Sequence, residues 1–191
     1  MKIPCEHFTV AELRETFDYD PITGVLSWKK RGRGRRVGRK AGRFDGRYYF
    51  IELLGKKLLG HRVAWTIYYG EWPKGRLDHR DRDANHNWIA NLRPATHAQN
   101  MVNKPANKHS KSGEKGVHQD KRDGRFYPYI DIDGRRKGLG GFEKLEDAVA
   151  ARRTAEAAHY GDFAYHLSAP PLRRIPIAAI PKPRKAAKVT A

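Results

Sequence analysis

Four side chains between residues 78 and 100 have the types and the order that hydrolysis of a phosphodiester bond requires. Asp78 and His79 are adjacent, Asn91 lies twelve residues after His79, and Asn100 lies nine residues after Asn91. This reaction needs a general base that activates water and a divalent cation held by hard oxygen ligands. A histidine can act as the base, and carboxylate and amide oxygens can hold the cation. Because such residues occur together in many proteins, their order and spacing carry more information than their composition.

The order of these residues is similar to a known motif. An Asp-His pair, a loop rich in Asp and Asn, the triplet Asn-Leu-Arg and a final Thr-x-x-x-Asn resemble the phage-type HNH homing endonucleases with a ββα-metal motif, in the H-N-N variant. The resemblance implies that His79 is the general base and that Asn91 orients its imidazole. It implies that Asp78 and Asn100 hold the metal ion. Oxygen ligands favour Mg²⁺ or Mn²⁺ over zinc.

Two strands and a helix must position these side chains. We expect residues 77–79 to end one strand and residues 91–93 to begin the next. Thr96 can cap a helix that carries Asn100. The residues between the strands are interpreted as loop and packing residues around the site: Asn85, Asn87 and Trp88.

Two further histidines could take part in the site. His61 begins an expected helix beside its apolar face, where a structural role is favoured over a catalytic one. His97 lies one turn before Asn100 on the same helix face, and a surface or phosphate-contacting role is favoured over a metal ligand. Whether either histidine contributes stays open at this point.

Local patterns upstream predict the elements that support the motif. Thr9 and Glu12 form a capping box, which predicts a helix over residues 10–17. Turn residues predict a turn over residues 20–24, a strand over residues 25–28 and a hairpin over residues 47–59. Helical periodicity predicts a helix over residues 61–69, which Gly70 ends.

The charge of the chain points to a polyanionic partner. The formal net charge is +18 and the pI is near 10.2, which favours nucleic acid. No apolar run approaches the length of a membrane span, so no membrane partner is expected. Between Lys29 and Arg43, nine Lys or Arg residues alternate with glycines. We expect this segment to stay mobile, without internal packing, until it contacts phosphate. Its predicted DNA contacts are Arg33, Arg35, Arg36, Arg39 and Lys40.

The cysteine content and the N-terminus indicate the compartment. Cys5 is the only cysteine, which excludes an internal disulfide and a cysteine-based zinc finger. The first residues lack the apolar core of a signal peptide. We therefore expect a cytoplasmic protein, in a bacterial or phage-infected host cell, that acts as a monomer without an obligate protein partner.

A second module follows a polar linker. Asp123-Gly124 and Asp133-Gly134 predict two hairpin turns and therefore three antiparallel strands. A helix over residues 145–160 is expected to cover the apolar face of this sheet with Leu145, Ala148, Val149, Ala155 and Ala158. The sequences of residues 112–117 and 145–151 resemble the Apetala/ethylene-response-factor (ERF) DNA-binding domains, although Phe126 and Lys137 depart from that pattern. The resemblance implies that the open sheet face enters the major groove. The predicted contacts are Arg122, Arg125, Tyr127, Tyr129 and Arg136.

The fold class that follows is α+β, with a ββα-metal HNH nuclease domain before a three-stranded antiparallel sheet packed on one helix. The predicted parts are an N-terminal helical segment (residues 1–19), the nuclease domain (20–104), a linker (105–111), an ERF-like DNA-binding domain (112–165) and a disordered basic tail (166–191).

These parts predict a metal-dependent endonuclease that acts on double-stranded DNA and nicks one strand per active site. The chemistry would be complete within residues 78–100, so removal of residues 112–191 should leave a nuclease that has lost its site preference. Two alternatives remain, a DNA-binding regulator without catalysis and a basic RNA-binding protein.

Overall fold

The computed structural model describes residues 7–104, 106 and 110–164. The described residues form two compact units, residues 7–96 and residues 97–164. The predicted basic tail and much of the predicted linker lie outside the described residues. In the part of the chain that is described, no helix is long and apolar enough to cross a membrane.

The first unit begins with a capped helix and a two-stranded ribbon. In helix α1 (Val10–Thr16), the Thr9 side chain accepts a hydrogen bond from the Glu12 amide while the Glu12 carboxylate accepts one from the Thr9 amide, which confirms the capping box. Strand β1 (Phe17–Tyr19) pairs antiparallel with β2 (Leu26–Trp28) through the expected turn over residues 20–24.

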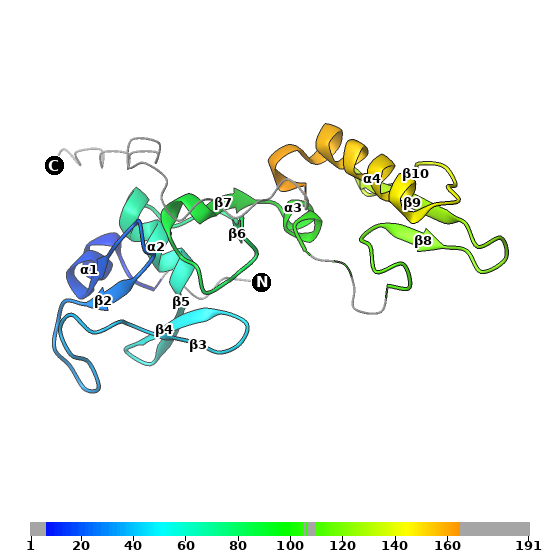
Figure 1. Ribbon diagram of the computed structural model, residues 1–191. Helices are drawn as coiled ribbons and strands as arrows, with labels where there is room; N and C mark the ends of the chain where they lie inside the picture. The colour runs from blue at the N-terminus through cyan, green and yellow to red at the C-terminus, as the bar shows by residue number, and fades with distance from the viewer. Residues whose placement is uncertain (1–6, 105, 107–109, 165–191) are drawn as a thin grey trace, which may run out of the picture. The chain divides into compact units, whose positions relative to one another are not determined.

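The predicted hairpin and the following helix are both present. Strands β3 (Arg43–Phe44), β4 (Tyr49–Leu53) and β5 (Lys56–Leu59) form an antiparallel sheet in that order. Helix α2 (Gly60–Tyr69) follows directly and packs on β4, β5 and α1 (Figure 1). It ends where Gly70 takes a left-handed φ of 77°, a conformation that glycine adopts without steric cost.

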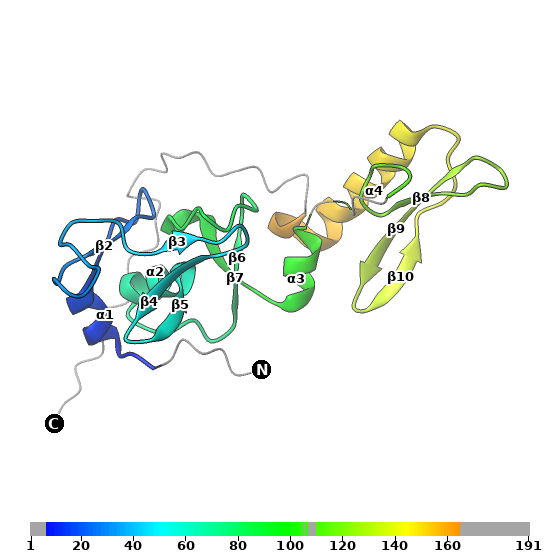
Figure 2. The same ribbon diagram turned by 90° about the horizontal axis from the view of Figure 1, so that it is seen from below.

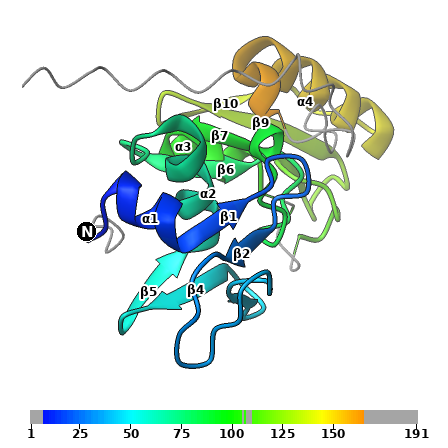
Figure 3. The same ribbon diagram turned by 90° about the vertical axis from the view of Figure 1, so that its left-hand side faces the viewer.

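The basic segment has a defined path, which corrects the expectation that it lacks internal packing. It leaves β2 as a long loop (Figure 3) and returns to it, because the Trp28 amide donates to the Arg39 carbonyl and the Ala41 amide donates to the Leu26 carbonyl. Ala41 is completely buried. The expectation was wrong because small residues at the end of the segment let it pair with β2.

The core of the first unit joins all of these elements to the candidate motif. Strand β6 (Arg76–His79), the 3₁₀ turn η1 (Ile89–Asn91) and strand β7 (Leu92–Ala95) complete the unit. Ile89 and Leu92 lie in the same buried cluster as the helices and the sheets. Its members are Leu13, Phe17, Leu26, Trp28, Ala41, Tyr49, Ile51, Leu53, Leu58, Val63, Ala64, Ile89 and Leu92.

The second unit contains the three strands and the long helix that the sequence predicts. Its elements are α3 (His97–Val102), β8 (Val117–Gln119), β9 (Phe126–Ile132), β10 (Arg135–Gly138), α4 (Leu145–Tyr160) and the 3₁₀ turn η2 (Gly161–Phe163). The sheet order is β8-β9-β10, all antiparallel, and α4 packs along β9 (Figure 2).

The buried face of α4 differs from the expected one. Ala148 is buried as expected, but Ala158 is exposed. Arg152 and Glu156 are buried instead, and the guanidinium donates to the carboxylate at 2.8 and 2.9 Å. The correction has a physical basis, because a charged pair one turn apart can be buried when each partner satisfies the other.

Candidate functional site

An antiparallel hairpin places Asp78 and His79 in a buried position. Strands β6 and β7 pair with Asp78 opposite Arg93 and His79 opposite Leu92. Asp78 and His79 are only 9% and 8% exposed. The strand that the sequence predicts for this part of the motif is therefore present, and its last two residues lie where water has limited access.

Arg93 fixes the orientation of the Asp78 carboxylate. Its Nε and a terminal nitrogen lie 2.8 and 2.7 Å from the same oxygen, Oδ2. Both side chains are at least nine-tenths buried. A charge-assisted pair of this geometry holds the carboxylate in one orientation. Arg93 belongs to the motif Asn-Leu-Arg, but only the cross-strand register shows that Arg93 orients Asp78.

His79 is held as a neutral imidazole. Its Nε2 lies 3.2 Å from Oδ1 of Asn87. Burial lowers the pKa of His79, and this effect outweighs the opposing influence of the Asn87 amide and of the aspartates at positions 78, 81 and 83. An amide oxygen only accepts, so Nε2 carries the proton in this contact and Nδ1 carries the lone pair. A neutral imidazole with a basic Nδ1 is the state that a general base needs.

Asn91 stabilises the loop and does not provide this contact, in contrast to the expected role. Its Oδ1 accepts from the Asp81 amide at 3.0 Å, while its Nδ2 donates to the Asp81 carboxylate at 2.9 Å and to the His86 carbonyl at 2.8 Å. In the described structure the imidazole contact comes from Asn87, which the sequence analysis interpreted as a loop residue. The reason is the path of the loop, which turns Asn87 inward toward β6.

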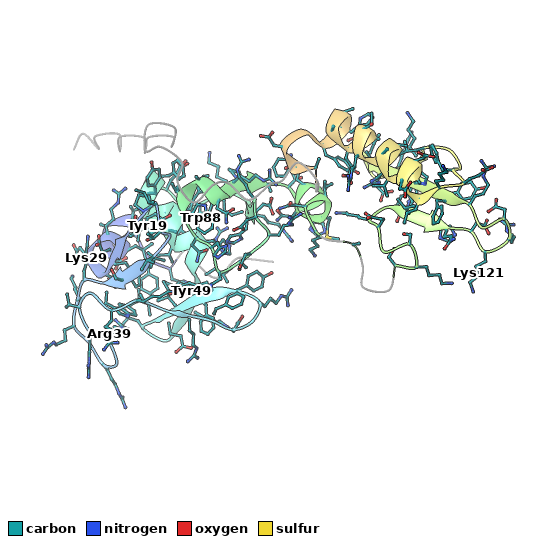
Figure 4. All side chains as sticks on the ribbon, in the orientation of Figure 1. Tyr19, Lys29, Arg39, Tyr49, Trp88 and Lys121 are labelled. Carbon is teal, nitrogen blue, oxygen red and sulfur yellow. The ribbon has the colours of Figure 1, made fainter. Side chains whose placement is uncertain are left out.

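The end of β1 and the turn that follows it hold the loop around Asn87 in place. The Tyr19 hydroxyl donates to the Asn87 carbonyl at 2.8 Å, and the Ile89 amide donates to the Pro21 carbonyl at 3.1 Å. Gly24 has a φ of +74°, and a Cβ there would lie 2.3 Å from the Trp88 amide nitrogen. Tyr19 and Trp88 are labelled in Figure 4. Residues far from the motif in sequence therefore determine where Asn87 lies.

His61 lies directly beside His79. The two rings meet edge to face, with centroids 5.2 Å apart. His61 is 6% exposed, and its Nδ1 has no hydrogen-bond partner within the described structure. Burial lowers its pKa to about 3, and His79 and Arg62 contribute in the same direction. His61 is therefore neutral at ordinary pH and packs against the ring of the candidate base. His97, by contrast, is exposed on α3.

Asn100 lies on α3 of the second unit. Its Oδ1 is buried and makes no hydrogen bond among the described residues. An orphaned amide oxygen is costly to bury unless it meets a donor or a cation, and it is the kind of hard ligand that Mg²⁺ or Mn²⁺ accepts. The described part of the chain contains no group of three or more His, Cys, Asp or Glu residues that could hold a metal ion. The Asp78 carboxylate of the first unit and the Asn100 amide of the second are each the kind of oxygen ligand that such a cation accepts, with water and phosphate as further ligands.

Three of the five predicted DNA contacts of the second unit lie on its sheet, and the other two lie in the turn between β8 and β9. Tyr127, Tyr129 and Arg136 border a shallow hollow that also includes glycines at positions 138, 140 and 141. Arg136 lies over the Tyr129 ring at 3.9 Å and donates to the Asp131 carboxylate at 3.0 Å. The other three predicted residues have partners as well. Arg122 pairs with Asp120, Arg125 donates to the Gly141 carbonyl, and the Tyr127 hydroxyl donates to Asp123.

The predicted DNA contacts of the first unit surround an aromatic ring. Arg31, Arg35, Arg36, Arg39 and Lys40 line a hollow that includes Trp28, and the Arg35 guanidinium lies 4.7 Å from the centre of the Trp28 ring. Arg33 lies in the same loop and is exposed. Figure 4 shows Lys29 and Arg39 at this edge of the unit.

Residues 59–102 match the family model described as HNH endonuclease. The matched segment runs from the end of β5 through α3 and so includes Asp78, His79, Asn91 and Asn100. The match supports an HNH nuclease, a hydrolase that acts on DNA. No curated protein and no solved structure matches the chain.

Proposed function

We propose that the chain is a metal-dependent endonuclease of the phage-type HNH homing class that hydrolyses phosphodiester bonds in double-stranded DNA. One observation carries the proposal. A buried, neutral imidazole at position 79 follows a buried carboxylate at position 78 that Arg93 orients, within the segment that matches the HNH endonuclease family.

His79 acts as the general base. Asn87 holds the proton on Nε2, so Nδ1 accepts a proton from the attacking water. Burial keeps the imidazole unprotonated at neutral pH. The His61 ring packs against the His79 ring and limits its rotation. The chain thus supplies a base whose tautomer and orientation are both set before the substrate arrives.

Asp78 and Asn100 would hold the cation, Mg²⁺ or Mn²⁺. When bound, such a cation neutralises the scissile phosphate and the departing 3′ oxygen, which leaves a 5′ phosphate on the product. Arg93 fixes one oxygen of the Asp78 carboxylate. Asn100 contributes an amide oxygen that has no other partner among the described residues. Asn91 keeps the loop closed around Asp81.

Two basic surfaces would bind the duplex. The hollow around Trp28 offers cations to the phosphate backbone, and the ERF-like sheet face of the second unit offers Tyr127, Tyr129 and Arg136 to a groove. Phosphate contacts supply affinity, whereas contacts with base edges supply specificity. One active site per chain cuts one strand, so a monomeric enzyme nicks its substrate.

A plasmid cleavage assay tests this function. We expect supercoiled DNA to be converted to the nicked form in Mg²⁺ or Mn²⁺ but not with a chelator. Binding to labelled duplex should be competed better by duplex DNA than by structured RNA. Duplex binding without cleavage at any metal concentration would instead indicate a regulator, and a preference for structured RNA would indicate an RNA-binding protein. Either result would contradict the proposed function.

A further inference from the structure

Helix α3, which carries Asn100, needs contacts with other segments to be stable. It has six residues, His97–Val102, and none of them is buried. A helix this short is unstable by itself, because the cost of nucleation is spread over too few hydrogen bonds. The carbonyl groups of its last turn have no following helical amide to accept from, and the Met101 carbonyl has only a long backbone contact, 3.4 Å, with the Lys104 amide. Contacts from elsewhere in the second unit must therefore stabilise α3.

Lys115 supplies the contact at the end of α3. Its Nζ donates to the carbonyl of Met101 at 3.0 Å, to that of Lys104 at 2.5 Å and to that of Val102. An ammonium group has three N–H donors, and here three carbonyls accept them. A positive charge at the C-terminal end of a helix is also favoured by the helix dipole. Lys115 thus satisfies carbonyl groups at and just beyond the end of α3.

The backbone around Lys115 is itself anchored in the sheet of the second unit. The next residue, Gly116, accepts a hydrogen bond from the Tyr129 amide of β9 at 2.8 Å. Gly116 has a φ of +68°, and a Cβ there would lie 2.6 Å from the Arg152 guanidinium carbon. Arg152 is part of the buried ion pair on α4. A chain of contacts therefore runs from the core of this unit to the end of α3.

We propose that Lys115 is a positioning residue for the cation site: it fixes α3 and, through it, the Oδ1 atom of Asn100. The inference rests on the proposed function, because it requires Asn100 to be a ligand. It gives a residue outside the segment 78–100 a part in metal binding. It also changes the expectation for a truncated protein, since removal of residues 112–191 would remove Lys115 and weaken metal binding.

The test compares two lysine-to-methionine variants of the full chain. Lys115→Met removes the three donors, while Lys144→Met removes the same charge from an exposed residue before α4. Binding of Mn²⁺ without DNA, followed by electron paramagnetic resonance, should weaken by about tenfold in Lys115→Met, as is typical when a residue that supports a ligand is lost. Hydrogen exchange of the α3 amides should become faster. Lys144→Met should match the wild type in both measurements.

A third variant separates this inference from the ligand assignment. Suppose that Asn100→Ala weakens Mn²⁺ binding while Lys115→Met binds as Lys144→Met does. Lys115 then has no positioning role, and Asn100 remains a ligand. If Asn100→Ala binds Mn²⁺ as the wild type does, both the ligand assignment and the role of Lys115 are overturned. Because Mn²⁺ binding and exchange are measured without cleavage, neither result depends on the activity of the enzyme.

Discussion

Arg93 and Arg136 each face an aspartate directly across an antiparallel strand pair, Asp78 in the first unit and Asp131 in the second. The first pair is buried, with side chains 6% and 10% exposed, and the second is open to solvent at 63% and 53%. A buried pair is rigid and costly to break, whereas an exposed pair contributes about 0–1 kcal/mol. The same kind of ion pair can therefore hold a carboxylate in place at one site, while at the other site it leaves the arginine able to exchange its aspartate for another anion.

Under the proposed function, this difference separates the residues that carry out the chemistry from the residues that bind DNA. Around His79 the polar groups are buried and bonded to one another, so the site is set before DNA arrives. In the second unit, Arg122 in a turn and Arg136 on the sheet form exposed ion pairs with Asp120 and Asp131, and a phosphate can replace the aspartate in each pair. Such exposed pairs keep the guanidinium groups oriented, and breaking them when DNA binds costs little free energy.

The largest effect should come from breaking the buried pair. Arg93→Met leaves the Asp78 carboxylate buried without its partner, which should lower the free energy of unfolding by about 3–5 kcal/mol. Urea unfolding followed by circular dichroism measures the loss. Arg136→Met, the matched change in the exposed pair, should cost about 1 kcal/mol or less. Equal losses in the two variants would remove the distinction between the pairs.

The contact that orients the base should matter next. Asn87→Ala removes the acceptor from Nε2 of His79 and leaves a buried donor unsatisfied, so the cleavage rate should fall about tenfold or more. Because the Asn87 amide raises the pKa of His79, its loss should also move the acid limb of the pH–rate profile to lower pH. Asn91→Ala should act mainly on stability, since its three side-chain hydrogen bonds lie within the loop. A lower rate and a shifted pH profile for Asn91→Ala alone would return the orienting role to that residue.

Acid should destabilise the buried histidines. The pKa of His61 is about 3 in the folded protein and about 6.5 in an unfolded chain. Below the unfolded value the unfolded chain binds a proton that the folded protein does not, so stability is lost as the pH falls. Between pH 7 and pH 5 this group should lower the free energy of unfolding by about 2 kcal/mol. Urea titrations at the two pH values measure it, and His61→Phe should show a smaller difference. An unchanged difference in that variant would argue against a buried, neutral His61.

The smallest effect concerns the exposed pair. Arg136→Met should reduce the dependence of log Kd on log salt concentration by roughly 0.9, the value for one phosphate contact on duplex DNA. Fluorescence anisotropy over a range of salt concentrations measures the slope. Asp131→Asn should leave the slope unchanged and strengthen DNA binding, because Arg136 no longer has to break its ion pair with Asp131 before it contacts phosphate. A slope that stays the same in Arg136→Met would mean that this face does not contact phosphate.

The sequence predicts the elements that depend on near neighbours. The capping box of α1, the β4–β5 hairpin and the end of α2 at Gly70 are all present because each depends on a few adjacent residues. The strands and the long helix of the second unit follow from turn residues in the same way. Their resemblance to an ERF domain stays a prediction.

The sequence could not predict contacts between distant segments. Asn87 and Asn91 are chemically identical, and only the support from Tyr19 and Gly24 determines that Asn87 turns toward His79. The role of Arg93 follows from strand register, which a single sequence leaves open. The pairing of the basic segment with β2 likewise joins residues 11 and 15 positions apart, Trp28 with Arg39 and Leu26 with Ala41.

Cleavage by His79→Ala, measured together with DNA affinity, tests the central claim most directly. Wild type and variant are compared on the same duplex in Mg²⁺, with cleavage followed under single-turnover conditions and Kd measured in Ca²⁺. The general base acts on water and does not bind DNA, so the cleavage rate should fall about 10²–10⁴-fold while Kd stays the same. Cleavage by the variant within a few-fold of the wild type would contradict the assignment of His79 as the base.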